Sequence, residues 1–130
     1  MAFITLSEHE EFLGKEIVDC AFRVHKDLGP GLLERVYEAC LCYELEKKGI
    51  LYKRQVPIPI IYDDKIFDEG FVADVLVDDL IICELKSVVE LNPLWQAQII
   101  SHLKLTNLRL GYLINFNVPL IKEGIKRFIV

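Results

Sequence analysis

Apolar residues recur at helical spacing through the first third of the chain, which predicts two consecutive helices. Ser7 and Glu10 have the spacing of a capping box, so the first helix is expected to begin there and to run to about Asp27. A Gly-Pro-Gly turn at residues 29–31 ends it, and a second helix follows directly. Two lysines and a glycine at residues 47–49 suit the C-terminal end of that second helix.

The spacing of the apolar residues then changes from helical to alternating, which predicts three strands in a row. In residues 56–60 the apolar side chains alternate with two prolines, which cannot donate to a ladder of hydrogen bonds. This segment is therefore expected to lie at the edge of a sheet. Residues 71–77 and 81–86 are mostly apolar and are expected to complete an antiparallel meander.

The last third of the chain predicts one more helix and one more strand. Asn92 and Pro93 are typical of a helix start, and this helix is expected to run to about residue 106. The apolar segment 109–116 should then lie parallel to the third strand, beside which a right-handed crossover through the helix would place it. Residues 119–128 are expected to form a short helix or an extended tail.

Together these elements predict one α/β domain over residues 1–130. Its mixed sheet is expected to have four strands, namely the three-stranded antiparallel meander and the parallel crossover strand, flanked by helices. A chain of 130 residues is too short for two domains with good cores. With 52% hydrophobic and 27% charged residues, a disordered chain is excluded.

Three charged residues, Asp74, Glu84 and Lys86, interrupt the two most apolar strands. A connection of three residues, 78–80, would place Asp74 directly across from Glu84. The same connection would place three cross-strand pairs of apolar residues on one face of the sheet: Val77 and Ile81, Val75 and Cys83, and Ala73 and Leu85. A slip of one residue would scramble both faces, so this register is favoured.

Cross-strand neighbours have Cβ atoms about 4.5–5.5 Å apart. Two carboxylates on such neighbours repel one another. One interpretation is a buried ion pair of Lys86 with Asp74 or Glu84, beside a spectator carboxylate. The interpretation that two acids and a lysine on one patch favour is metal-assisted hydrolysis. The acids would hold Mg²⁺, and the lysine would position or help to deprotonate the attacking water.

The cysteines and histidines predict no site of their own. The cysteines lack the paired spacing of a zinc site and are interpreted as buried, reduced thiols, and no local pattern supports a Cys–His nucleophile. The histidines are too scattered to indicate a metal cluster. These residues are Cys20, Cys40, Cys42, Cys83, His9, His25 and His102.

Hydropathy and charge indicate where the protein is located and which class of partner it binds. No apolar run reaches the roughly 18 residues of a membrane span, and residues 1–11 lack the pattern of a secretory signal, so a cytoplasmic protein is expected. The net charge of −5 argues mildly against nucleic acid as a partner. The charge is uneven, however, because residues 1–90 hold 10 Lys+Arg and 19 Asp+Glu, whereas residues 91–130 hold 5 and 1. The cations of the second part are candidates for a phosphate-facing side: Lys104, Arg109, Lys122, Lys126 and Arg127.

Two motifs resemble a known family. Asp74 followed after nine residues by Glu84-Leu85-Lys86 resembles the D…ExK core of the PD-(D/E)XK nuclease superfamily. Gly31, Glu34 and Tyr37 match the GxxExxY signature of a small bacterial and archaeal family placed in that superfamily, and the resemblance extends over roughly residues 25–116.

The resemblance implies a restriction-endonuclease-like core and hydrolysis of phosphodiester bonds in DNA or RNA with Mg²⁺ or Mn²⁺. It implies that Asp74, Glu84 and Lys86 take the D…ExK roles, with Glu34 as a further acid and metal ligand. Gln98 stands at the first position of a QxxxY element found in related nucleases. Two positions depart from the family pattern, since His102 replaces the tyrosine of that element and Ala73 replaces the proline before the first acid.

Several interpretations stay open from the sequence. Glu34 on its own would suit the first turn of a helix, where it complements the dipole. His25 is either a helix-end residue or a neighbour of Glu34, and Trp95 is a core or covering aromatic. The alternative to a nuclease is a non-catalytic module that binds nucleic acid or protein. Nucleic-acid binding is expected to be weak and salt-sensitive, and a homodimer is an alternative to a monomer.

Overall fold

The computed structural model describes residues 5–130, which form an α/β fold with a mixed sheet flanked by helices. Residues 1–4, part of the predicted domain and of the segment inspected for a secretory signal, lie outside the described residues. The elements in chain order are α1 (Glu8–Leu28), α2 (Glu34–Lys47), β1 (Tyr52–Tyr62), β2 (Lys65–Val77), β3 (Ile81–Lys86), α3 (Pro93–Thr106), β4 (Leu110–Asn115), the 3-10 helix η1 (Ile121–Glu123) and β5 (Ile125–Ile129).

The sheet has the order β1-β2-β3-β4-β5. The meander β1-β2-β3 is antiparallel and β4 is parallel to β3, as predicted. The prediction of four strands is wrong, because β5 adds a fifth strand antiparallel to β4. The expected tail therefore contains η1 and a strand. Its five residues, Ile125–Ile129, carry two adjacent cations and are too few to show a period in the sequence.

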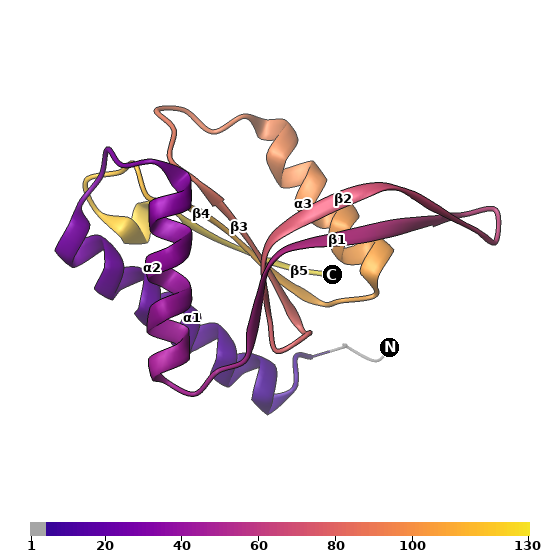
Figure 1. Ribbon diagram of the computed structural model, residues 1–130, viewed down its shortest axis with the longest axis horizontal. Coiled ribbons are helices and arrows are strands. Elements are labelled where there is room, and N and C mark those ends of the chain that lie inside the picture. Colours follow the sequence, from indigo (N-terminus) through magenta and orange to yellow (C-terminus); the bar gives the residue numbers. More distant parts are fainter. Residues whose placement is uncertain (1–4) are drawn as a thin grey trace.

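Helices cover both faces of the sheet (Figure 1). Leu13 and Ile17 of α1 and Leu41 and Leu45 of α2 pack against one face, in the larger of two buried clusters. α3 covers the other face, where Leu103 packs against Ile82 and Ala73. The capping box predicted at Ser7 is present, and it starts α1 at Glu8.

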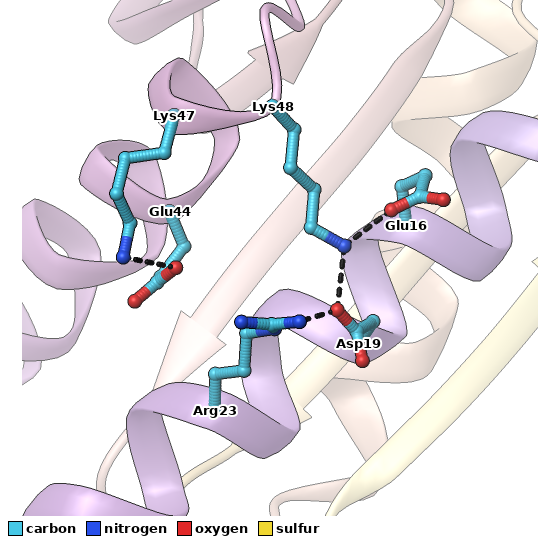
Figure 2. A network of polar contacts seen from close by, with 6 residues as sticks. All are labelled: Glu16, Asp19, Arg23, Glu44, Lys47 and Lys48. Carbon is cyan, nitrogen blue, oxygen red and sulfur yellow. Dashed lines mark hydrogen bonds and ion pairs between the residues drawn. The ribbon is translucent and has the colours of Figure 1, made fainter.

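Ion pairs join α1 to the C-terminal end of α2 (Figure 2). Lys48 Nζ lies between Glu16 and Asp19, 2.5 Å from Asp19 Oδ2, and Arg23 Nε donates to the same carboxylate at 2.8 Å. These two cations, Lys48 first, lower the pKa of Asp19. The groups are partly exposed, so they contribute mainly to the relative orientation of the helices.

Strands β1 and β2 form a long hairpin that projects beyond the body of the molecule (Figure 1). β1 is the edge strand that its two prolines predicted. The register shifts between Ile58 and Ile60, opposite Gly70. A Cβ at Gly70 would lie 1.7 Å from the carbonyl oxygen of Ile58, so only glycine fits this close crossing.

The register predicted for β2 and β3 is confirmed for Val75 with Cys83 and Val77 with Ile81. The single apolar face predicted for these strands is wrong at Ala73, which lies on the α3 side, whereas Val75 lies on the side of α1 and α2. The side chains of β2 thus change face at Asp74, which lies between these two residues. Gln55 of β1 has a φ of 50°, and no ladder pair joins it to β2.

Candidate functional site

The irregularity in β2 places the carboxylate of Asp74 against β3. Its Oδ2 accepts a hydrogen bond of 2.9 Å from the backbone N–H of Leu85, where a regular ladder would supply a backbone carbonyl. The ladder between the two strands ends at the pair Val75–Cys83. Asp74 is thereby fixed beside both Glu84 and Lys86, the residues that flank Leu85.

Glu84 is half-buried, and one oxygen of its carboxyl group is enclosed and unsatisfied. Its Oε1 is enclosed and has no hydrogen-bond partner within residues 5–130. Burial, followed by the charge of Asp74 and a hydrogen bond with it, raises the pKa of Glu84 to about 9. Without a bound cation, this carboxyl group therefore carries a proton at neutral pH. A buried, unpaired carboxylate oxygen beside a second carboxylate is a donor set that suits a divalent cation.

The side chain of Lys86 lies beside the acids but rests on an aromatic ring. Its Nζ is 4.2 Å from the centre of the Trp95 ring. In the described part of the chain it makes no ion pair with a carboxylate. It is near enough to Glu84 and Glu34 for its charge to counter, in part, the rise in their pKa values.

Glu34 is the first residue of α2, and its side chain is exposed. Partial burial, and then the charge of Asp74, raises its pKa. It is thus a neighbour of Asp74 and Lys86, although the carboxylates of Glu34, Asp74 and Glu84 do not form a three-ligand cluster. No group of three or more His, Cys, Asp or Glu side chains within residues 5–130 is placed to hold a metal ion as the side chains stand.

The loop that leads to Glu34 is held by the tyrosine of the GxxExxY motif. The hydroxyl of Tyr37 donates to the carbonyl of Gly29 at 2.6 Å and accepts from the N–H of Leu32 at 3.1 Å. Ser87, just after β3, donates to the carbonyl of Leu32 at 2.6 Å. The start of α2 is therefore tied to the end of the strand that carries Glu84 and Lys86.

Of the three motif positions, only Glu34 and Tyr37 lie on the helix α2. Gly31 precedes the helix and has a φ of 99°, a left-handed backbone that favours glycine. Tyr37 is fully buried, and its ring stacks on Phe116 with centroids 4.5 Å apart. The glycine and the tyrosine thus shape the loop, and only the glutamate of the motif lies next to the charged residues.

Glu38 belongs to the site and was missed from the sequence. It is buried, with a side chain held by Arg54 Nη2 at 2.9 Å and by Gln55 Nε2 at 2.5 Å. Gln55 Nε2 also lies 3.4 Å from Oδ1 of Asp74. A signal was present, because position 38 lies one helical turn after Glu34 and next to buried Tyr37.

Gln98 and His102 of α3 lie on the far side of Glu84. With Glu84, Lys86 and Trp95 they line a cavity of about 30 Å³, enough room for a water molecule. The ring of His102 stacks on Phe71 with centroids 3.5 Å apart. Its Nδ1 is buried with no partner in the described chain, and burial lowers its pKa. Gln98 is exposed at the rim of this cavity.

His25, which the sequence left open, lies away from these groups, and the buried cysteines are unreactive. His25 Nε2 donates to the carbonyl of Val118 at 2.8 Å, so it holds the segment before η1 rather than Glu34. Burial raises the pKa of Cys20 to about 11 and that of Cys42 to about 12, and it raises that of Cys83 well above the ordinary value of a thiol. Such thiols stay protonated and are poor nucleophiles.

The candidate basic side does not form as one surface. Arg127 pairs with Glu11 on the α1 side of the sheet at 3.0 Å, and Arg109 Nη1 donates to the carbonyl of Thr5 at 2.9 Å. Leu113 of β4 pairs with Glu84 of β3 on one side and with Lys126 of β5 on the other. Lys126 therefore lies on the same face of the sheet as Glu84. The adjacent cations Lys126 and Arg127 thus lie on opposite faces of the sheet.

The comparisons with known proteins give one match. A family model described as the PD-(D/E)XK nuclease superfamily matches residues 11–128, nearly the whole chain. No curated protein and no solved structure matches. Among the described residues, no helix is both long enough and apolar enough to cross a membrane.

Proposed function

Because the chain belongs to the PD-(D/E)XK nuclease superfamily, we propose that it is a nuclease that hydrolyses phosphodiester bonds of DNA or RNA with Mg²⁺ or Mn²⁺. The observation that carries this proposal is the pair Asp74 and Glu84. One buried oxygen of Glu84 has no partner among the described groups, and Asp74 is locked beside it by the N–H of Leu85.

Asp74 and Glu84 are the proposed ligands of the cation, and Glu34 is the third acid of the site. A bound divalent cation would remove the repulsion between the carboxylates, stabilise the charge of the attacked phosphate and lower the pKa of a bound water. Glu84 must lose its proton to bind the cation. The loop held by Tyr37 supports Glu34 near enough to Asp74 for the charge of Asp74 to act on its pKa.

Lys86 and Gln98 are proposed to act on the substrate. The ammonium group of Lys86 orients the attacking water and offsets the negative charge that develops on the phosphate. The amide of Gln98 offers donors to phosphate oxygens at the rim of the cavity beside Glu84. Glu34, Tyr37 and Gly31 support assignment to the GxxExxY branch of the superfamily.

The test is cleavage of single- and double-stranded DNA and RNA with Mg²⁺, with Mn²⁺ and with a chelator. Glu84→Gln and Lys86→Met should each lower the cleavage rate at least about 100-fold, since each removes a group that contacts the reacting centre. Lys15→Met is the matched control for the lysine, because Lys15 is exposed on α1. The proposal fails if the wild-type protein cleaves no substrate and Mg²⁺ leaves its melting temperature unchanged.

A binding module without turnover is the second candidate. The observation that favours it is the separation of Glu34 from the other two carboxylates, which leaves the ligand set incomplete as the side chains stand. Nucleic-acid binding that persists in Asp74→Asn, in a wild-type protein that does not cleave, would support this candidate. In either case, we expect action in the cytoplasm, and light scattering would distinguish a monomer from a homodimer.

A further inference from the structure

We propose that Trp95 is a positioning residue that holds the ammonium group of Lys86 at the edge of the site and away from the carboxylates. This inference rests on the proposed function, because it gives Lys86 its role in hydrolysis. It adds a residue that the D…ExK and GxxExxY patterns do not contain.

The contact between the two side chains is close. Lys86 Nζ lies 4.2 Å from the centre of the Trp95 ring, whereas the other cation–π pairs of the described chain, Lys47 with Tyr43 and Lys65 with Phe67, measure 4.9 and 5.4 Å. Indole has the strongest quadrupole of the three aromatic side chains, and both partners here are half-buried. The pair is therefore the strongest of the three by ring type and by distance.

The position of Trp95 is set by the start of α3. Asn92 caps the helix through its Oδ1, which accepts from the N–H of Leu94 at 2.9 Å, and its carbonyl accepts from the N–H of Trp95 at 3.0 Å. Pro93 fixes the backbone of the first helical position. The indole is thus presented from a rigid helical turn to the end of β3.

The ring resolves a conflict at the site. A flexible lysine next to two acids would be expected to pair with them, and it would then occupy the oxygens that a cation needs. Lys86 instead rests on the ring while the buried Oε1 of Glu84 has no partner in residues 5–130. Trp95 therefore holds the ammonium group of Lys86 in one place beside the reacting centre, and it leaves the carboxylates available.

The contact can be tested without any enzymatic activity. Trp95 is the one tryptophan in the sequence, so 5-fluorotryptophan incorporated during expression labels this site alone. Lys86→Met should shift the single ¹⁹F resonance of the metal-free protein. The matched control is Lys104→Met, on the same helix as Trp95, and it should not shift the resonance. In ¹H spectra the ε-methylene of Lys86 should be displaced upfield by the ring and should return to the position of the other lysines in Trp95→Leu. An ε-methylene that already resonates with the other lysines in the wild type would overturn the contact.

The role in hydrolysis is tested by kinetics. Trp95→Leu should lower kcat about 2- to 30-fold with little change in KM, and progressive fluorination of the indole should lower kcat stepwise at constant melting temperature. Leu94→Ala, an exposed residue in the same turn, is the control and should leave kcat unchanged. An unchanged kcat across the fluorinated series would overturn the positioning role. A wild-type protein without cleavage would instead overturn the proposed function, and with it the role in hydrolysis, while the spectra would still decide the contact.

Discussion

The backbone N–H of Leu85 donates a hydrogen bond of 2.9 Å to Oδ2 of Asp74. Because Leu85 lies between Glu84 and Lys86, this bond sets the position of all three charged residues relative to one another. The carboxylate takes the place of a backbone carbonyl at the point where β2 changes the face its side chains occupy. The arrangement of the site therefore depends on a strand irregularity, and substitutions at Asp74 should separate its structural role from its charge.

Asp74→Asn and Asp74→Ala are expected to differ in stability. Asparagine keeps an oxygen that accepts from Leu85, so the free energy of unfolding in urea should fall by less than about 1 kcal/mol. Alanine leaves that buried N–H without a partner and should cost about 1–3 kcal/mol. Both variants should lose cleavage. Equal stability of the two variants would show that the bond to Leu85 contributes nothing measurable.

The raised pKa of Glu84 predicts a pH dependence of stability in the absence of metal. The folded protein holds a proton on Glu84 up to pH of about 9, whereas the unfolded chain loses it near the ordinary value of 4.5. Between these values the folded state binds more protons, so stability falls as pH rises, by up to roughly 1.4 kcal/mol per pH unit from this group. This contribution is fully present below pH of about 4.5 and is lost as pH rises through about 9.

Urea unfolding of the wild type and Glu84→Gln at several pH values checks this dependence, since glutamine cannot titrate. The wild type should lose stability relative to Glu84→Gln between pH 5 and 9. Saturating Mg²⁺ should reduce the difference, because it binds the deprotonated group. Parallel stability curves for the two proteins would contradict the burial of an unpaired carboxyl group at this position.

Tyr37→Phe should loosen the loop that leads to Glu34. The variant keeps the stack on Phe116 but removes the hydroxyl that bonds both Gly29 and Leu32. A loss of about 1–2 kcal/mol in the free energy of unfolding is expected, together with a lower cleavage rate. Tyr43→Phe is the matched control, since Tyr43 lies on the same helix and is 59% exposed. If Tyr43→Phe destabilised the protein equally, the hydroxyl bonds of Tyr37 would have no special role.

Substitutions of Glu34 and Glu38, both on α2, should distinguish a glutamate needed for cleavage from one needed for stability. Glu38→Ala leaves Arg54 and Gln55 without their shared partner and should lower the free energy of unfolding by about 2–4 kcal/mol. Glu34→Gln changes an exposed side chain and should alter stability by less than about 0.5 kcal/mol while it lowers the cleavage rate. The reverse order of the two effects on stability would be evidence against this assignment.

The charged residues of the sheet could be predicted because each breaks a pattern that is otherwise apolar. The register between Val75 and Cys83 followed from the same pattern, as did the edge position of β1, where two prolines leave little choice. These features depend on local sequence, because a single charged residue is easily recognised in a strand whose other residues are apolar.

Other features depend on contacts between distant segments and could not be predicted. The change of face at Ala73 lies beside Gln55 of β1, which has a left-handed backbone although its residue type has no special preference for that conformation. The strand β5 exists because β4 offers an unpaired edge, and its own five residues show no clear period. Trp95 meets Lys86 only because a cap at Asn92 fixes the first turn of α3.

The central claim is that Asp74 and Glu84 together hold a divalent cation. The most direct measurement is the anomalous difference density of a crystal soaked in Mn²⁺, compared with a crystal of Glu84→Gln treated in the same way. The account predicts one strong peak bonded to a carboxylate oxygen of Asp74 and to Oε1 of Glu84 in the wild type, and its loss in the variant. The absence of a peak between these residues at saturating Mn²⁺, or an equal peak in Glu84→Gln, would contradict it.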